Sequence, residues 1–148
     1  MTKVDRARPL PRSAFAVFRE VHPQWRDNDV YGHVNNAVHY TWFDSTVNAW
    51  LIENELLTIG RSAVVGLVVA SCCEYFSEVA FPDRVACGMR VAQVGTSSVR
   101  YELGLFRNDE TLSFARGHFV HVYVEWPARL PVPLGPRHRQ AVESLRRA

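Results

Sequence analysis

Apolar residues between positions 36 and about 57 recur at steps of three and four, the spacing of one face of an α-helix. One apolar stripe consists of Tyr40, Phe43, Val47, Trp50 and Leu51. Further apolar residues, among them Trp42 and Ile52, lie well away from that stripe. A helix that is apolar around much of its girth has to be buried on several sides. The pattern therefore predicts a long central helix with a sheet wrapped around it.

After this helix the apolar positions alternate with polar ones, the spacing of strands with one buried face. The first such segment covers residues 65–81, with the odd positions inward. Two more follow, and their inward residues are Val85, Cys87, Met89 and Val91 in one and Val99, Tyr101, Leu103 and Leu105 in the next. A long closing strand is expected over residues 112–126. Tight turns between the later strands, at residues 95–98 and 107–110, imply an antiparallel meander.

The whole chain of 148 residues is expected to form a single α+β domain over residues 1–148. A shorter strand over residues 15–25 precedes the helix, and residues 1–12 are expected to form a loose N-terminal arm. Residues 127–148 hold a Pro-rich segment and a short C-terminal helix. Because an open sheet leaves edge strands that can pair across a two-fold axis, a homodimer or homotetramer is expected.

The composition is that of a packed globular chain, with 47% hydrophobic and 22% charged residues. The net charge of +2 is unevenly spread, because residues 1–12 and 129–148 hold nine of the 17 basic residues and two of the 15 acidic ones. Basic ends of this kind either contact nucleic acid or CoA phosphates, or remain solvated. No basic stripe with interleaved aromatic residues is present, so nucleic-acid binding is not expected.

Several other classes of function lack their sequence signatures. Cys72, Cys73 and Cys87 form no CxxC motif and are expected to be reduced, small apolar residues. His118 and His121 lie an odd number of positions apart on a strand and face opposite sides, which argues against a metal site. There is no Gly-x-Ser-x-Gly elbow, P-loop or dinucleotide fingerprint. Without a signal peptide or a long apolar run, the chain is expected to be cytoplasmic and free of the membrane.

Residues 27–36 (Asp-Asn-Asp-Val-Tyr-Gly-His-Val-Asn-Asn) gather polar side chains directly ahead of the predicted helix. Asn35 or Asn36 is a good helix N-cap, because a short side-chain oxygen accepts from the free N–H groups of the first turn. The unpaired N–H groups and the positive dipole end of that helix would then lie close to Asp29. A carboxylate beside an array of N–H donors is suited to attack a carbonyl group and to stabilise the oxyanion that forms.

The pattern D-x-D-x-x-G-H-V-N-N followed by an aromatic-rich helix resembles the 4-hydroxybenzoyl-CoA thioesterase-like family of hot-dog proteins. The Tyr-Thr-Trp-Phe-Asp stretch at residues 40–44, the strand spacing and the Pro-rich tail extend the resemblance over residues 15–145. It implies the hot-dog fold, in which an antiparallel sheet wraps around a long central helix. It also implies an acyl-CoA thioesterase that works as a homo-oligomer, with the site near the subunit boundary. CoA is then part of the substrate, and no metal or other cofactor is expected.

In that family the second Asp of the motif is the catalytic carboxylate, which corresponds to Asp29. The N–H that polarises the thioester carbonyl comes from the helix start, at Asn36. A related branch carries its carboxylate further along the helix, where this chain has Asp44 and Glu53. Because the motif fits the first branch, Asp29 is the predicted catalytic residue.

The other residues of the motif are expected to support this pair. Gly32 permits the backbone turn that brings the loop onto the helix. His33 orients the loop or lines the acyl pocket, and both roles remain open. Asn35 is expected to cap the helix, and Asp27 to brace the loop.

The sequence leaves several alternatives open. Asp29 either attacks the carbonyl carbon to form a mixed anhydride or acts as a general base on water. A hot-dog acyl-thioester dehydratase or hydratase is the alternative enzyme, and a non-catalytic acyl-thioester-binding module is the alternative outside enzymes. The acyl chain preference and the choice between CoA and acyl carrier protein are not specified. Arg61, Arg90, Arg100 and the arginines of the C-terminal tail are candidates for contacts with CoA phosphates.

Overall fold

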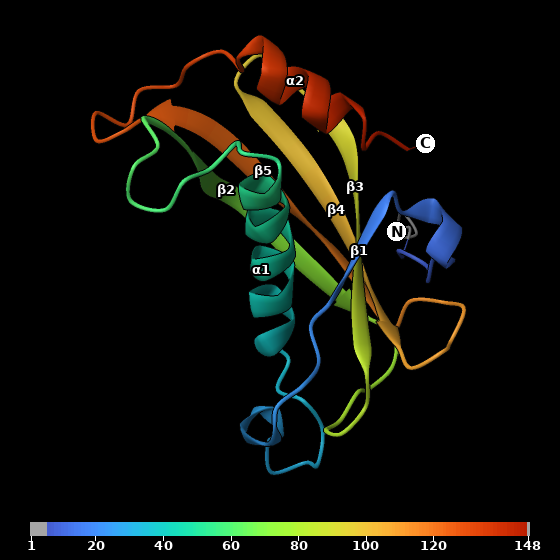
Figure 1. Cartoon of the computed structure of the whole chain (residues 1–148). Coiled ribbons are helices and arrows are strands. Elements are labelled where there is room, and N and C mark those ends of the chain that lie inside the picture. The colour runs from blue at the N-terminus through green and yellow to red at the C-terminus, as the bar shows by residue number, and fades with distance from the viewer. Residues whose placement is uncertain (1–5, 148) are drawn as a thin grey trace, which may run out of the picture.

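Within residues 6–147, the part of the chain that this computed structural model describes, five antiparallel strands curve around one long helix (Figure 1). The strands are β1 (Val17–Glu20), β2 (Val64–Tyr75), β3 (Val85–Val94), β4 (Ser98–Arg107) and β5 (Ala115–Glu125). The helices are α1 (Val38–Glu53) and α2 (Pro136–Glu143), with short 3-10 turns at Arg12–Ala14 and Trp25–Asp27. The sheet order is β1-β3-β4-β5-β2, so β1 and β2 are the edges. This is the predicted α+β hot-dog arrangement.

The core lies between α1 and the face of the sheet that the alternating pattern predicted. All eight inward residues predicted for β3 and β4 are at most 1% exposed. Phe43, Val47 and Leu51 of α1 pack against them. Burying an apolar side chain of this size stabilises a fold by about 1.5–3 kcal/mol. The register of these two strands is therefore set by their inward residues, because a slip by one position would turn each of them outward.

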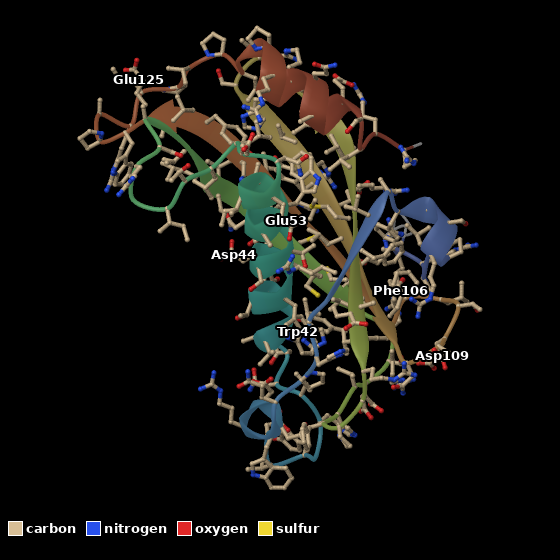
Figure 2. The ribbon with its side chains drawn as sticks, in the orientation of Figure 1. Trp42, Asp44, Glu53, Phe106, Asp109 and Glu125 are labelled. Atoms are coloured by element: carbon tan, nitrogen blue, oxygen red, sulfur yellow. The ribbon has the colours of Figure 1, made fainter. Side chains whose placement is uncertain are left out.

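The central helix is buried along one broad face, and the prediction of burial on several sides is wrong. α1 covers Val38–Glu53, a shorter span than the expected residues 36–57. Its outer face includes exposed Thr41 and Asp44, and Ile52 is 42% exposed. Figure 2 shows Asp44 pointing away from the sheet. A five-stranded sheet can cover only one side of a helix, so the outer face of α1 meets solvent.

The edge strands depart most from their predicted pattern. β1 has four residues, and the chain leaves the sheet well before residue 25. β2 pairs only with β5, and a β-bulge between Val68 and Ala70 breaks its alternation. Val68, Val69 and Tyr75 are 43–61% exposed, because no strand lies beyond β2 in one chain. β5 begins three residues later than expected, at Ala115.

The N-terminal segment covers the opposite face of the sheet. Residues 1–5 of the predicted loose arm lie outside the described residues. Residues 8–12 are attached, because their backbone and the Arg12 guanidinium exchange hydrogen bonds with the β4–β5 turn and the start of β5. Beyond them Phe15 packs edge-on against Phe106, with ring centroids 5.8 Å apart. Figure 2 shows Phe106 on the side of the sheet turned away from α1. This second apolar cluster attaches the arm.

The C-terminal helix closes the core at the far end of β3. Val142 of α2 is fully buried and Leu145 is 5% exposed. The Leu145 carbonyl accepts a hydrogen bond from the Val91 N–H at 3.0 Å. Since β1 pairs with β3 only as far as Met89, the segment after α2 satisfies the next backbone donor of that strand.

Candidate active site

The acidic loop of residues 27–36 is a small hairpin attached to the segment that follows β2. The Asp29 N–H donates to the His33 carbonyl at 2.9 Å, and the Gly32 N–H donates back to the Asp29 carbonyl at 3.0 Å. Gly32 has a φ of 81°, in the left-handed region that glycine enters without steric cost. The Val34 N–H donates to the Val79 carbonyl at 2.8 Å. These bonds hold the loop in one position relative to the sheet.

The Asp29 carboxylate has one oxygen in a local turn and one available. Oδ1 accepts a hydrogen bond from the Tyr31 N–H at 2.9 Å, which is an Asx turn. Among residues 6–147, no group donates a hydrogen bond to Oδ2. The turn fixes the orientation of the carboxylate and leaves Oδ2 able to act on another molecule.

The start of α1 is built differently from the prediction. The N-cap is Ala37, whose side chain makes no cap bond, so the expectation of Asn35 or Asn36 as N-cap is wrong. Asn35 accepts two hydrogen bonds just ahead of the helix. Its Oδ1 accepts the Ala37 N–H at 2.9 Å, and its carbonyl accepts the Val38 N–H at 3.0 Å. The Asn36 N–H has no hydrogen-bond partner in the described part of the chain.

A cavity of about 340 Å³ lies where this loop, the start of α1 and the end of β2 meet. It is lined by Asp29, Tyr31, His33, Val34, Asn36, His39, Tyr75, Ser77, Glu78 and Val79. The structure therefore brings together Asp29, His33 and Asn36 of the predicted site. Gly32 and Asn35 shape the loop and the helix start without lining the cavity.

His39, Tyr75 and Glu78 were not predicted as site residues. His39 lies one helical turn after Asn36, and Tyr75 is the last odd-numbered residue of β2, on the strand face that turns toward the helix. The helical spacing of His39 and the strand alternation of Tyr75 can both be read from the sequence. Only the sheet order shows that the two side chains line the same cavity. Glu78 pairs with His33 at 2.9 Å between Oε2 and Nε2.

The other carboxylates considered for the site lie elsewhere. Asp27 Oδ2 accepts the Gln24 N–H at 2.7 Å and so caps the 3-10 turn Trp25–Asp27. Asp44 lines a separate open groove between α1 and β2. Glu53 binds the Arg19 guanidinium at 2.6 Å. None of these three side chains shares the cavity of Asp29.

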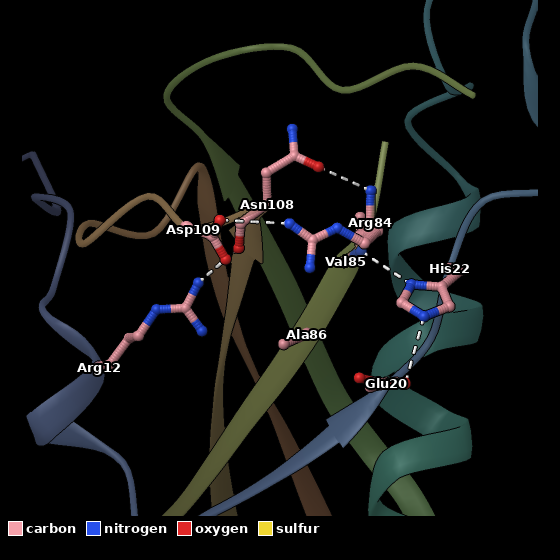
Figure 3. Close-up of a pocket in the computed structure, with 8 residues that line it drawn as sticks. All are labelled: Arg12, Glu20, His22, Arg84, Val85, Ala86, Asn108 and Asp109. Atoms are coloured by element: carbon pink, nitrogen blue, oxygen red, sulfur yellow. Dashed lines mark hydrogen bonds and ion pairs between the residues drawn. The ribbon is translucent and has the colours of Figure 1, made fainter. Parts of the chain in front are cut away.

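A second depression, of about 290 Å³, carries several charged groups that already satisfy one another (Figure 3). Arg84 pairs with Asp109 at 3.3 Å, and His22 Nδ1 accepts the Val85 N–H at 3.1 Å. The Arg12 guanidinium is held by a backbone carbonyl of the β4–β5 turn. This depression lies where the N-terminal segment contacts the sheet.

The histidines and cysteines behave as their strand positions predicted. His121 is buried against Tyr101, whereas His118 Nδ1 lies 3.0 Å from the Cys72 Sγ on the opposite face. Cys73 packs against the core on the other side from Cys72. Within residues 6–147 no three His, Cys, Asp or Glu residues are grouped so as to hold a metal ion.

None of the lining residues of the cavity is an arginine. Arg90 and Arg100, two of the candidates for phosphate contacts, lie on the face of the sheet opposite α1. Arg90 binds Glu102 there at 3.1 Å, and Arg100 contacts His118 at 3.2 Å. No helix among the described residues has the length and apolar character to cross a membrane.

A curved antiparallel sheet, a central helix and an acidic loop at the helix start define a hot-dog protein. The sequence profile of the Thioesterase-like superfamily matches residues 23–142. The chain therefore belongs to the thioesterase-like superfamily.

Two solved structures and one further sequence are similar to this chain. The PA5185 protein of Pseudomonas aeruginosa strain PAO1 is 44% identical, with a TM-score of 0.92 over 95% of this chain and 99% of its own. A thioesterase of Thermus thermophilus, solved with coenzyme A and Zn, is 30% identical, with a TM-score of 0.75 over 89% and 95%. The match to the uncharacterized protein YsmA of Bacillus subtilis (strain 168), 19% identical over 88 residues, covers 60% of this chain and 59% of that protein.

Proposed function

We propose that this protein hydrolyses acyl-CoA thioesters, with Asp29 as the catalytic carboxylate and the Asn36 N–H as the donor to the oxyanion. The proposal rests on one observation: Asp29 and Asn36 line the same cavity, and among residues 6–147 neither Asp29 Oδ2 nor the Asn36 N–H has a hydrogen-bond partner. The similarity to a thioesterase that binds coenzyme A supports CoA as the thiol part of the substrate. The side chains that line the cavity do not select one acyl group.

The chemistry follows from these two groups. A carbonyl oxygen placed at the Asn36 N–H becomes negatively charged as the carbonyl carbon is attacked, and the N–H and the positive end of α1 stabilise that charge. Asp29 Oδ2 either forms a bond to the carbonyl carbon, which gives a mixed anhydride that water then cleaves, or removes a proton from the attacking water. In both routes the C–S bond breaks and CoA leaves as the thiolate. The products are the free acid and CoA.

A homodimer is part of the proposal. The edge of β2 presents Val64, Val68, Val69 and Tyr75, all at least 40% exposed, beside the cavity and the groove of α1. An exposed apolar edge strand is a template for pairing with another strand, and a two-fold axis would pair β2 with itself. Since Tyr75 belongs to both the edge and the cavity, a partner seated on β2 would border the site.

The test is release of free thiol from a panel of acyl-CoAs, from acetyl to palmitoyl and including aromatic acyl groups. Asp29→Asn is the decisive variant, because Asn retains an Oδ1 acceptor for the Tyr31 N–H and removes only the charge. We expect its kcat to fall by about a thousand-fold or more. Asp44→Asn is the matched control and should leave kcat within about two-fold. Equal activity of wild type and Asp29→Asn would contradict the role of Asp29, and a loss in Asp44→Asn instead would favour the alternative helix carboxylate.

A further inference from the structure

Three of the four backbone donors of residues 35–38, which lead into α1, have partners in the described chain. Asn35 donates its N–H to the Asp27 carbonyl at 2.9 Å, and Val38 donates to the Asn35 carbonyl at 3.0 Å. The Ala37 N–H donates to Asn35 Oδ1 at 2.9 Å. Asn36 alone, among residues 35–38, has an N–H without a partner in the described chain. A donor left free in an otherwise bonded segment is suited to a ligand, because its direction is set by its neighbours.

The peptide group between Asn36 and Ala37 is held from both sides. Its N–H is bound by Asn35 Oδ1, as above. Its carbonyl, that of Asn36, accepts a hydrogen bond from the Tyr75 hydroxyl at 2.7 Å. Tyr75 ends β2, where it pairs with Ala115, so this bond joins the helix start to the sheet across 39 positions of sequence. Holding this peptide plane restricts rotation about the Asn36 backbone and so limits how far the neighbouring Asn36 N–H can turn.

His39 supports the Tyr75 ring. It is 3% exposed, and its ring meets that of Tyr75 edge-on at 4.8 Å and that of Phe114 at 5.9 Å. Burial lowers the pKa of His39 to about 4, against the opposing effect of the Asn35 and Asn36 carbonyls, so its ring is neutral near pH 7. Its Nδ1 is buried and has no hydrogen-bond partner within residues 6–147. A buried nitrogen without a partner destabilises a fold.

We propose that Tyr75 is a positioning residue of the hydrolytic site, which fixes the Asn36 peptide through its hydroxyl, and that the His39 ring holds the Tyr75 ring in place. This inference rests on the proposed function of Asn36 as oxyanion donor. The edge strand β2 then takes part in the reaction, because Tyr75, which orients the Asn36 N–H, belongs to β2. Burial raises the pKa of the Tyr75 phenol, which keeps the proton that the hydrogen bond needs.

The decisive variant is Tyr75→Phe, which removes only the hydroxyl. Tyr40→Phe is the matched control, since it removes a hydroxyl from the first turn of α1 at a residue that does not line the cavity. We expect kcat of Tyr75→Phe to fall about ten-fold with KM within about two-fold, because oxyanion stabilisation acts in the transition state and not on bound substrate. Amide exchange at Ala37 should become about three- to ten-fold faster, since its peptide plane loses one of two anchors. The control should change neither quantity.

The two readouts separate this inference from the proposed function. If wild type is active and Tyr75→Phe keeps its kcat and its Ala37 exchange rate, the positioning role is overturned and the proposed function stands. If kcat is unchanged but KM rises, Tyr75 binds substrate and the positioning role is again overturned. If wild type hydrolyses no thioester, the proposed function fails and this role in catalysis fails with it. The exchange rate at Ala37 then decides alone whether Tyr75 holds the peptide.

His39 is tested by a pair of variants. His39→Ala removes the support of the Tyr75 ring and should lower kcat as Tyr75→Phe does, with no further loss when the two are combined. His39→Phe restores the ring without the unpaired nitrogen, so it should recover most of the activity and raise the midpoint of thermal unfolding by about 3 °C. A folded His39→Phe variant without activity would overturn the supporting role, because it would show that the imidazole itself is required.

Discussion

His33 Nε2 lies 2.9 Å from Glu78 Oε2, and this contact joins the acidic loop to the segment that follows β2. Both side chains are exposed to solvent, 41% for His33 and 70% for Glu78. Solvent screens such a pair, so its contribution to stability is small. The loop is held mainly by its backbone bonds, such as that from the Val34 N–H to the Val79 carbonyl.

The first prediction concerns this pair. Glu78→Gln should change the free energy of unfolding by less than about 1 kcal/mol, because an exposed ion pair contributes little. The turnover number should fall by no more than about three-fold, since the backbone bonds keep the loop in place. Urea unfolding and the thiol-release assay measure both quantities. A loss comparable to that of Asp29→Asn would show that Glu78 takes part in the chemistry.

The second prediction concerns the β2 edge. Val69 is 61% exposed and lies in the bulge, where it has no partner residue in β5. Val69→Glu should therefore leave the sheet intact and replace a dimer by a monomer in sedimentation velocity, with a parallel loss of thiol release. Leu112→Glu is the control, a charge at a 53% exposed position in the β4–β5 turn. A dimeric Val69→Glu variant would mean that the subunits associate through another surface.

The third prediction concerns stability in acid. Burial, and to a smaller extent the nearby His138, lower the pKa of His121 from an ordinary value of 6.5 to about 4. The unfolded chain then binds more protons between pH 6.5 and about 4, so the free energy of unfolding falls as the pH falls through this range. One such group accounts for up to about 1.4 kcal/mol per pH unit.

This pH dependence can be assigned to the interior by comparison of variants. His121→Phe should make the decrease in stability from about pH 7 to about pH 5 smaller than in wild type, because it removes one titrating group. The remaining decrease is expected from His39, whose pKa burial also lowers to about 4, and from His118 and His138, whose pKa values burial lowers as well. His33→Gln, at an exposed position, serves as the comparison in chemical unfolding at each pH. An unchanged slope in His121→Phe would contradict the assignment.

The fourth prediction concerns the close approach of β2 and β5. A Cβ at Gly117 would lie 2.6 Å from Phe43 Cε2 and closer still to the Cys72 carbonyl oxygen. Since a backbone carbonyl in a paired strand cannot move aside cheaply, Gly117→Ala should destabilise the fold by about 1–3 kcal/mol. Gly135→Ala is the matched control: it has open space around it and should change stability by less than about 1 kcal/mol. Equal stability of the two variants would contradict this account of the packing.

The sequence determined the features that depend on neighbours along the chain. The inward residues of β3 and β4 could be predicted because alternation fixes which face of a strand is apolar. Helical spacing likewise located α1, although it predicted too long an element. The acidic loop of residues 27–36 was identifiable because its turn residues, carboxylates and asparagines are adjacent. Each of these signals is local, because it depends only on residues that are close together in the sequence.

The tertiary structure decided what depends on the order of the strands. No local pattern shows that β2 is an edge or that Phe15 and Phe106 form a second cluster. Nor does one show that α1 begins at Val38, after an N-cap residue without a side-chain cap bond. The bond from the Tyr75 hydroxyl to the Asn36 carbonyl depends on the pairing of β2 with β5, and on the packing of α1 against the sheet. Long-range contacts of this kind arise from how the faces of several elements fit together, and periodicity within one element carries no information on its partners.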